Sequence, residues 1–227
     1  MHMKRTLIIS LALVLTLVIG GWLMAGSQIL GDRSGTEEPA YTVQATLGDA
    51  MEVRRYGDRV AVETDMSDSG GRPFMRLYDY ITGANQGTRK IAMTIPVAME
   101  PQGAETIAMT APVEMTRRAG QGRFIRFMLP AEYTIDTAPK PTNPRVRLVA
   151  LPAQDVAVRR FSGWRSPPLE RRNTRVLTDR LARSDWRASG PPVTWVYDPI
   201  WTLPFLRRNE IAIPVEPKTS ANDTGGD

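Results

Sequence analysis

The sequence predicts an α+β fold, in which one folded domain follows an apolar N-terminal segment. Strand-like and helix-like patterns alternate through the domain, and the order strand–strand–helix–strand occurs twice. The composition agrees with this, since 42% of the residues are apolar and 23% are charged, which is ordinary for a globular protein with a buried core. The chain has 227 residues, enough for one or two domains.

The N-terminal segment, residues 1–27, contains an uncharged run of twenty residues from Thr6 to Ala25. At about 1.5 Å per residue, a helix of this length crosses a hydrocarbon core of about 30 Å. The run is long for a signal peptide, and Trp22 near its end is typical of a membrane interface, which favours an uncleaved transmembrane anchor. Ala25-Gly26-Ser27 provides an acceptable cleavage site, so a signal peptide remains the alternative.

The charges around this segment predict its orientation. Lys4 and Arg5 precede the run, and no acidic residue lies before Asp32. Because such charges stay inside, we expect a single-pass protein of the cytoplasmic membrane with its domain on the periplasmic side, or an exported protein if the segment is cleaved. Without these two residues, 27 basic residues face 24 acidic ones, a net charge of +3. That small excess does not require nucleic acid as a partner.

Two residue types that often carry chemistry are missing from the domain. Cysteine is absent, which excludes disulfides and thiolate sites, and the single histidine is His2. The domain therefore has no Ser-His-Asp triad and no histidine zinc site, and we expect no metal site and no catalytic residue. Glu52, Glu63, Glu114 and Tyr78 are candidate acids or bases, but no carboxylates stand at a recognisable spacing. The sequence favours a binding protein over an enzyme.

The chain divides into four parts by composition, the first of which is the N-terminal segment, residues 1–27. Residues 28–39 are polar and contain glycine, as in a linker. Residues 40–216 hold the alternating patterns and form the folded domain. Residues 217–227 are polar and small, which is typical of a disordered tail.

The first half of the domain opens with two expected strands and a helix. The strands are Met51–Tyr56 and Arg59–Glu63, joined at Gly57-Asp58. The helix begins near Pro73 and ends at Gly83. Its apolar residues recur at i, i+3, i+4 and i+7 and are expected to face the core: Phe74, Leu77, Tyr78 and Ile81.

A seven-residue pattern then occurs twice, as Ile91-Ala92-Met93-Thr94-x-Pro96-Val97 and Ile107-Ala108-Met109-Thr110-x-Pro112-Val113. Large apolar residues alternate with small ones in each copy. This alternation predicts two strands, each with one bulky face toward the core and one small face that another element can approach. The proline in each copy favours an edge position or a bulge. A further strand is expected at Phe124–Leu129.

The second half repeats the rhythm of the first. Val146–Pro152 followed by Val156–Val158 resembles Met51–Val62. One helix and two strands complete it, near Leu169–Trp186, Thr194–Tyr197 and Glu210–Val215. A duplication of this kind is expected to place a cleft between the halves, where binding sites often lie.

Short motifs run through the domain beside the doubled pattern. They are Glu52-Val53-Arg54-x-Tyr56, Phe74-x-x-Leu77-x-x-Tyr80-Ile81-x-Gly83-x-Asn85, Phe127-Met128-Leu129-Pro130-x-x-Tyr133-Thr134, Pro144-Arg145-Val146, Phe161-Ser162-Gly163, Tyr197-Asp198-Pro199 and Pro204-Phe205-Leu206-Arg207-Arg208-Asn209-Glu210. In this order, the series resembles the SOUL haem-binding family. The resemblance implies a distorted β-barrel of two four-stranded antiparallel sheets with two flanking helices and an internal two-fold repeat. It also implies a fold similar to effector-binding domains of the gyrase-inhibitor type.

The resemblance further implies that the domain binds haem or another tetrapyrrole, non-covalently, in a shallow apolar cleft beside the first helix. The expected binding residues are Arg72, Met75, Arg76, Tyr78, Met93 and Met109. Because the domain has no His or Cys for iron, binding would rest on apolar burial, with arginine on the propionates.

Structural roles remain open for the same residues: Met93 and Met109 fit a core face, and the arginines fit a solvated surface. The alternative function is a non-catalytic sensor or carrier of another apolar small molecule.

Overall fold

The computed structural model describes residues 29–68, 70–87, 104–118, 120 and 122–218. The expected N-terminal anchor, the first copy of the doubled motif with Met93, and residues 219–227 of the tail lie outside this part of the chain. Within the described residues, no helix combines the length and the apolar character needed to span a bilayer.

The described residues form an α+β fold with a ten-stranded antiparallel sheet and a small two-stranded sheet. In chain order, the elements are β1 (Tyr41–Gly48), β2 (Met51–Tyr56), β3 (Arg59–Asp65), α2 (Arg72–Ile81), β4 (Asn85–Gln86), β5 (Val113–Arg118), β6 (Gly122–Met128), β7 (Lys140–Pro141), β8 (Val146–Leu151), β9 (Gln154–Phe161), α3 (Pro167–Ala182), β10 (Trp186–Ala188), β11 (Val193–Val196), the 3-10 helix η1 (Pro204–Leu206) and β12 (Asn209–Pro217).

The order of strands in the large sheet is β1-β2-β9-β12-β11-β5-β6-β3-β8, with β10 beside β12. This order is symmetric about the β11–β5 pair, since β2, β9, β12 and β11 correspond to β8, β3, β6 and β5. Along the chain, β2-β3-α2-β5-β6 is followed by β8-β9-α3-β11-β12, so the order of elements repeats as the sequence rhythm predicts. We call the group β5, β6, β3, β8 with α2 the α2 block, and the group β11, β12, β9, β2 with α3 the α3 block.

The expectation of two separate four-stranded sheets is corrected by the structure. The two blocks are parts of one sheet, because β11 pairs with β5 through Thr194–Met115, Trp195–Glu114 and Val196–Val113. This pairing satisfies backbone groups that two separate sheets would leave on exposed edges.

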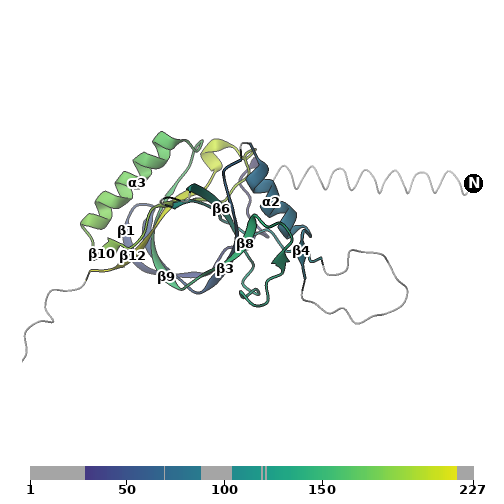
Figure 1. Cartoon of the computed structure of the whole chain (residues 1–227). Coiled ribbons are helices and arrows are strands. Elements are labelled where there is room, and N and C mark those ends of the chain that lie inside the picture. Colours follow the sequence, from purple (N-terminus) through teal and green to yellow (C-terminus); the bar gives the residue numbers. More distant parts are fainter. Residues whose placement is uncertain (1–28, 69, 88–103, 119, 121, 219–227) are drawn as a thin grey trace, which may run out of the picture.

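The two blocks also exchange strands. β2 pairs with β9 in the α3 block, and β3 pairs with β8 in the α2 block, so Gly57-Asp58 connects β2 to β3 without forming a hairpin. The matching connection between β8 and β9 lies beside it, since the Ala153 amide donates to the Asp58 carboxylate at 2.7 Å. The blocks therefore meet on two sides, and the sheet curls round on itself as a half-barrel (Figure 1).

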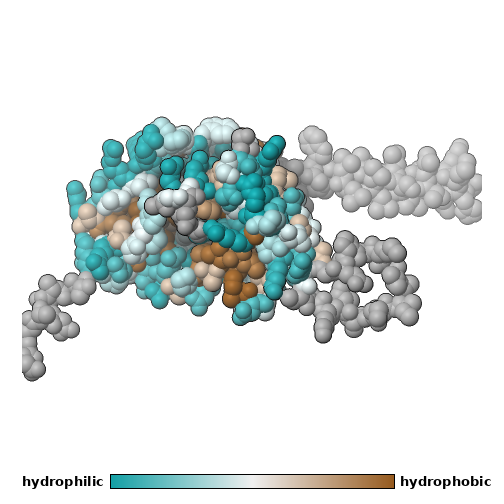
Figure 2. Space-filling view, in the orientation of Figure 1, coloured by the Kyte–Doolittle hydropathy of each residue, from teal (hydrophilic) through white to brown (hydrophobic). Residues whose placement is uncertain are grey.

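The curled sheet has an outer face that carries the helices and an inner face. α2 packs on β3, β6 and β8, and α3 packs on β9, β10 and β12. Figure 1 shows the helices on opposite outer sides of the sheet. Each helix covers its own apolar cluster, and a third cluster around Trp195 and Tyr56 lies on the inner face. The surface seen along the curled sheet is mostly hydrophilic, with a hydrophobic area near β8 (Figure 2).

The buried face of α2 differs from the expected one. Its buried residues are Pro73, Leu77, Tyr80 and Ile81, whereas the expected core residues Phe74 and Tyr78 are exposed. Tyr80 can be buried because its hydroxyl donates to the Pro139 carbonyl at 2.8 Å. This pairing satisfies the polar group that would otherwise oppose burial.

The second copy of the doubled motif is only partly a strand. β5 begins at Val113, and residues 107–112 pass along the domain without a strand partner. The Ile107 amide donates to Ile81 at the end of α2, and the Ala111 amide donates to Glu37. Met109 is 41% exposed, so the expectation of a continuous bulky core face is wrong at this residue.

α3 and the residues before β1 also depart from expectation. The Ser166 hydroxyl caps α3 by accepting from the Leu169 amide, and the helix ends at Ala182 rather than near Trp186, which instead begins β10. Residues 29–39, expected as a linker, are held against the domain by ion pairs of Arg33 with Asp198 and of Glu38 with Arg208.

Candidate functional site

Three side chains of α2 form an exposed apolar surface on the outside of the α2 block. Phe74, Met75 and Tyr78 are each between 36% and 47% exposed and share one side of the helix. The Phe74 and Tyr78 rings are stacked at an interplanar angle of 14°. Phe74 also packs edge-on against Phe127 of β6, with ring centroids 5.0 Å apart. We call these three side chains the α2 surface. It is mainly aromatic, it is packed against β6 through Phe127, and its other side is exposed to solvent.

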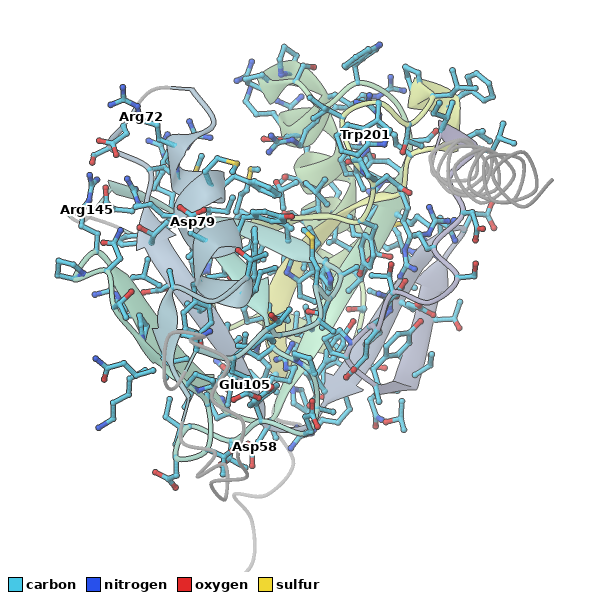
Figure 3. The ribbon with its side chains drawn as sticks, turned by 90° about the vertical axis from the view of Figure 1, so that its right-hand side faces the viewer. Asp58, Arg72, Asp79, Glu105, Arg145 and Trp201 are labelled. Carbon is cyan, nitrogen blue, oxygen red and sulfur yellow. The ribbon has the colours of Figure 1, made fainter. Side chains whose placement is uncertain are left out.

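Charges of opposite sign lie at the two ends of the α2 surface. Arg72 stands at the first turn of α2 and Asp79 near the last, both exposed (Figure 3). Seven residues separate them, which is about 10 Å along the helix axis. Within the described residues, no carboxylate lies within ion-pair distance of Arg72. An anionic group on this surface would therefore be drawn to the Arg72 end.

Arg76, a predicted binding residue, makes its contacts within the protein, with the end of β3 and the residues that follow it. Its Nε donates to the Thr64 hydroxyl at 3.0 Å, its Nη2 donates to the Asp65 carbonyl at 2.7 Å, and it pairs with Asp68. Arg145 pairs with the same two aspartates, and its hydrogen bonds together with those of Ser67 lower the pKa of Asp65. These contacts hold the start of α2 against the end of β3, so the guanidinium of Arg76 is already occupied.

The predicted binding residues are thus only partly brought together. Arg72, Met75, Arg76 and Tyr78 all lie on α2. Met109 lies on the segment that Ile107 ties to the end of α2, and Met93 is outside the described residues. The sequence does not identify Phe74 as a site residue, because its spacing with Leu77 and Ile81 predicts a place in the core. The competing spacing of Pro73, Leu77 and Tyr80 was the available signal.

A second candidate site is a cavity of about 630 Å³ on the inner face of the sheet. Its walls come from both blocks: Glu114, Thr116, Arg117, Arg126, Leu151, Gln154, Val156, Pro191, Val193, Trp195 and Pro214. This volume falls within the range of about 300–1,000 Å³ that is usual for small-molecule sites. The sequence predicts a cleft between the halves, but it does not indicate which residues line it.

A chain of paired charges includes two of the residues that line the cavity, Glu114 and Arg126. Arg126 donates to Glu63 at 2.7 Å and to Glu114 at 2.6 Å, while the Trp195 indole donates to Glu114 at 3.0 Å. The Arg147 Nε donates to the other oxygen of the Glu63 carboxylate at 2.5 Å. Burial lowers the pKa of Arg126, but the carboxylates of Glu114 and Glu63 raise it by more. Both carboxylates are therefore paired with arginines.

A second buried cluster surrounds Glu210 at the start of β12. Its carboxylate, fully buried, accepts from Arg54 at 2.9 Å, from Arg208 at 2.9 Å and from the Tyr197 hydroxyl at 2.6 Å. Arg54 also pairs with Glu52, so that candidate acid has a partner too. Burial raises the pKa of Tyr197 well above its usual range. The buried negative charge of Glu210 is therefore balanced by the two arginines that contact it.

Comparison with solved structures gives similarities at low identity. The chain is similar to the C-terminal domain of EcmrR (11% identity, TM-score 0.48, covering 78% of this chain and 98% of that one). It is also similar to a hydrolase from Listeria innocua (12% identity, TM-score 0.48, covering 73% of this chain and 91% of that one). A third similar structure is SAV2435 bound to tetraphenylphosphonium (10% identity, TM-score 0.40, covering 73% of this chain and 93% of that one). At this level, none of them indicates what this chain binds.

Comparison of the sequence with protein families identifies the family of the chain. No curated protein matches the chain. The family model described as SOUL heme-binding protein matches residues 36–214, a range that includes both α2 and the strands that line the cavity. Because this match covers most of the sequence, the chain belongs to the SOUL haem-binding protein family.

Proposed function

We propose that this protein binds haem or a related tetrapyrrole non-covalently on the α2 surface, at the periplasmic side of the cytoplasmic membrane. The observation that carries the proposal is the stacked, exposed pair Phe74 and Tyr78 with Met75 beside them, in a chain of this family. A flat apolar macrocycle matches a flat aromatic surface. We infer a binding role rather than catalysis, because Glu52, Glu63 and Glu114 are held by arginines.

The residues of the α2 surface fit the parts of such a ligand. Each 100 Å² of apolar area removed from water stabilises the complex by about 2.5 kcal/mol. Arg72 is placed to give a propionate a charge-assisted hydrogen bond. The Met75 thioether and the Tyr78 phenol are groups that coordinate haem iron in other proteins. The affinity is expected to depend on salt through Arg72 and on burial through the rings.

Hemin titration of the full chain in detergent tests the proposal. We expect a saturable change in the Soret band, weakened at least about tenfold by Met75→Glu, which puts a charge against the macrocycle. Phe205→Ser is the matched control, because Phe205 is an exposed aromatic residue that belongs to η1 and does not line the cavity. Unchanged binding by Met75→Glu would contradict the α2 site.

The 630 Å³ cavity supports a second candidate function, the carriage of another apolar small molecule against Trp195. Val193→Phe narrows this cavity and leaves α2 untouched. If the cavity is the binding site, Val193→Phe weakens the binding of metal-free protoporphyrin and Met75→Glu does not. If the α2 surface is the site, the two variants give the opposite pattern.

A further inference from the structure

A second exposed apolar surface lies at the end of the domain where residues 29–31 enter it. It consists of Leu30, Trp164, Ile200, Trp201 and Phe205, which are between 58% and 79% exposed. We call it the aromatic surface. Large exposed apolar patches on soluble domains usually mark an interaction site, and nothing in the α2 surface or the cavity uses these residues.

Three separate segments of the chain build the aromatic surface. The Leu203 amide donates to the Ile29 carbonyl at 3.0 Å, and the Gly163 amide donates to the Pro204 carbonyl at 2.8 Å. Arg207 stacks over the Trp164 ring at 4.1 Å and donates to the Thr202 carbonyl at 2.8 Å. The surface is therefore a fixed platform whose aromatic side chains project from a hydrogen-bonded backbone.

The distance from the apolar N-terminal run indicates what covers this platform. The run ends at Ala25, four residues before Ile29. Four residues span at most about 14 Å, so Ile29 must lie within that distance of the end of the run. The headgroup layer on each side of a bilayer is roughly 5–8 Å thick. If the run lies in a membrane, the aromatic surface is therefore tethered within reach of the interface.

The composition of the surface suits that position. Trp164 and Trp201 are of the residue type most enriched where hydrocarbon meets headgroups. Arg171 and Arg172, exposed in the first turns of α3 just after Trp164, add positive charge that anionic lipids attract. In Figure 3, Trp201 lies toward the same end of the domain as Arg72, with Glu105 and Asp58 at the opposite end.

We propose that the aromatic surface lies on the lipid bilayer that holds the N-terminal run. This contact fixes the orientation of the domain, with Asp58 and Glu105 turned away from the membrane. The proposal depends on the run being in the membrane, and it is independent of haem binding.

The absence of cysteine allows a direct test on the full chain. Phe205→Cys and Glu132→Cys are each labelled with a fluorescent probe and reconstituted in vesicles of phosphatidylcholine and phosphatidylglycerol that carry nitroxide-labelled lipid. Glu132 is the matched control, because it is exposed and its neighbour Tyr133 is bonded to Glu105 at the far end of the domain. We expect several-fold stronger quenching by the lipid nitroxide at position 205 than at position 132.

Four outcomes decide the proposal. Strong quenching at 205, which falls when Trp201→Ser is added, supports contact with lipid. Equal, weak quenching at both positions in chains that float with the vesicles overturns it, as does failure of the chain to float at all. Immobilisation of the 205 label that is the same in detergent and in vesicles, without lipid quenching, would assign the surface to a second copy of the chain instead.

Discussion

At the scale of single residues, buried charge is the main feature of the inner face. Glu210 has no exposed surface and is surrounded by Arg54, Arg208 and the Tyr197 hydroxyl. Glu63 and Glu114 are held in the same way by Arg126. The sequence shows these glutamates inside apolar strands, but it does not show all their partners, because the pairs Arg54–Glu210 and Arg126–Glu63 join residues far apart in the chain.

Removal of one partner from this cluster should be costly. Glu210→Ala removes the fully buried carboxylate that Arg54, Arg208 and the Tyr197 hydroxyl share, and is expected to lower the free energy of unfolding by about 3–5 kcal/mol. Urea unfolding of the variant checks this. Glu216→Ala, in an exposed ion pair with Arg187, serves as the control with an expected loss below about 1 kcal/mol. Similar losses in the two variants would contradict the role of burial.

Tyr56 is expected to make the stability of the folded protein depend on pH above about pH 10. Burial raises the pKa of Tyr56 to about 12, although Arg54 opposes this. The folded state therefore holds the phenol proton more tightly than the unfolded state, so its stabilisation is complete below pH 10 and is lost as the pH rises toward 12. Melting temperatures from pH 9 to 12 should fall, and the fall should be shallower in Tyr56→Phe, which keeps the ring contact with Trp195. An identical slope in the variant would refute this assignment.

At the scale of elements, the sequence predicts the kinds and order of helices and strands better than their faces. The rhythm of β2 and β3 returns in β8 and β9, and both helices form. The sequence does not predict the buried face of α2 correctly, because two apolar stripes overlap on the helix and the Tyr80 hydrogen bond to Pro139, which favours one of them, cannot be read from the pattern. Residues 107–112 fail as a strand because their amides bond to α2 and to the segment before β1.

The two sides of α2 can be compared directly. Tyr80→Ala empties a fully buried position and should lower the free energy of unfolding by about 3–5 kcal/mol. Tyr78→Ala, on the exposed side of the same helix, should change it by less than about 1 kcal/mol. Thermal or urea unfolding of the two variants is the measurement. A larger loss in Tyr78→Ala would restore the face that the sequence pattern suggests.

At the scale of the whole molecule, the sheet joins the two blocks so closely that neither is complete alone. β2 belongs to the first repeat and pairs in the α3 block, while β8 belongs to the second repeat and pairs in the α2 block. The pairing of β11 with β5 adds a further seam. No local pattern predicts this exchange, because a single strand sequence does not specify which neighbour it pairs with.

The strand exchange predicts one cooperative transition. Urea unfolding followed by far-ultraviolet circular dichroism and by tryptophan fluorescence should give coincident curves, because opening either block removes a strand from the other. Tryptophan fluorescence follows mainly the second repeat, since Trp164, Trp186, Trp195 and Trp201 all lie in its part of the chain. Separate midpoints for the two signals would show that the blocks unfold independently.

The same exchange has a consequence for how the chain tolerates being cut. The segment between β6 and β8, which contains the short strand β7, is the place where the first repeat ends and the second begins. A backbone broken there yields two fragments that share strands: the first places β1 and β2 beside β9 of the second, and the second places β8 beside β3 of the first. Such fragments are expected to remain associated and to reassemble when mixed, as a complementing pair. Each would have an incomplete sheet edge by itself, so the intact protein resembles a strand-swapped dimer that has been joined into one polypeptide.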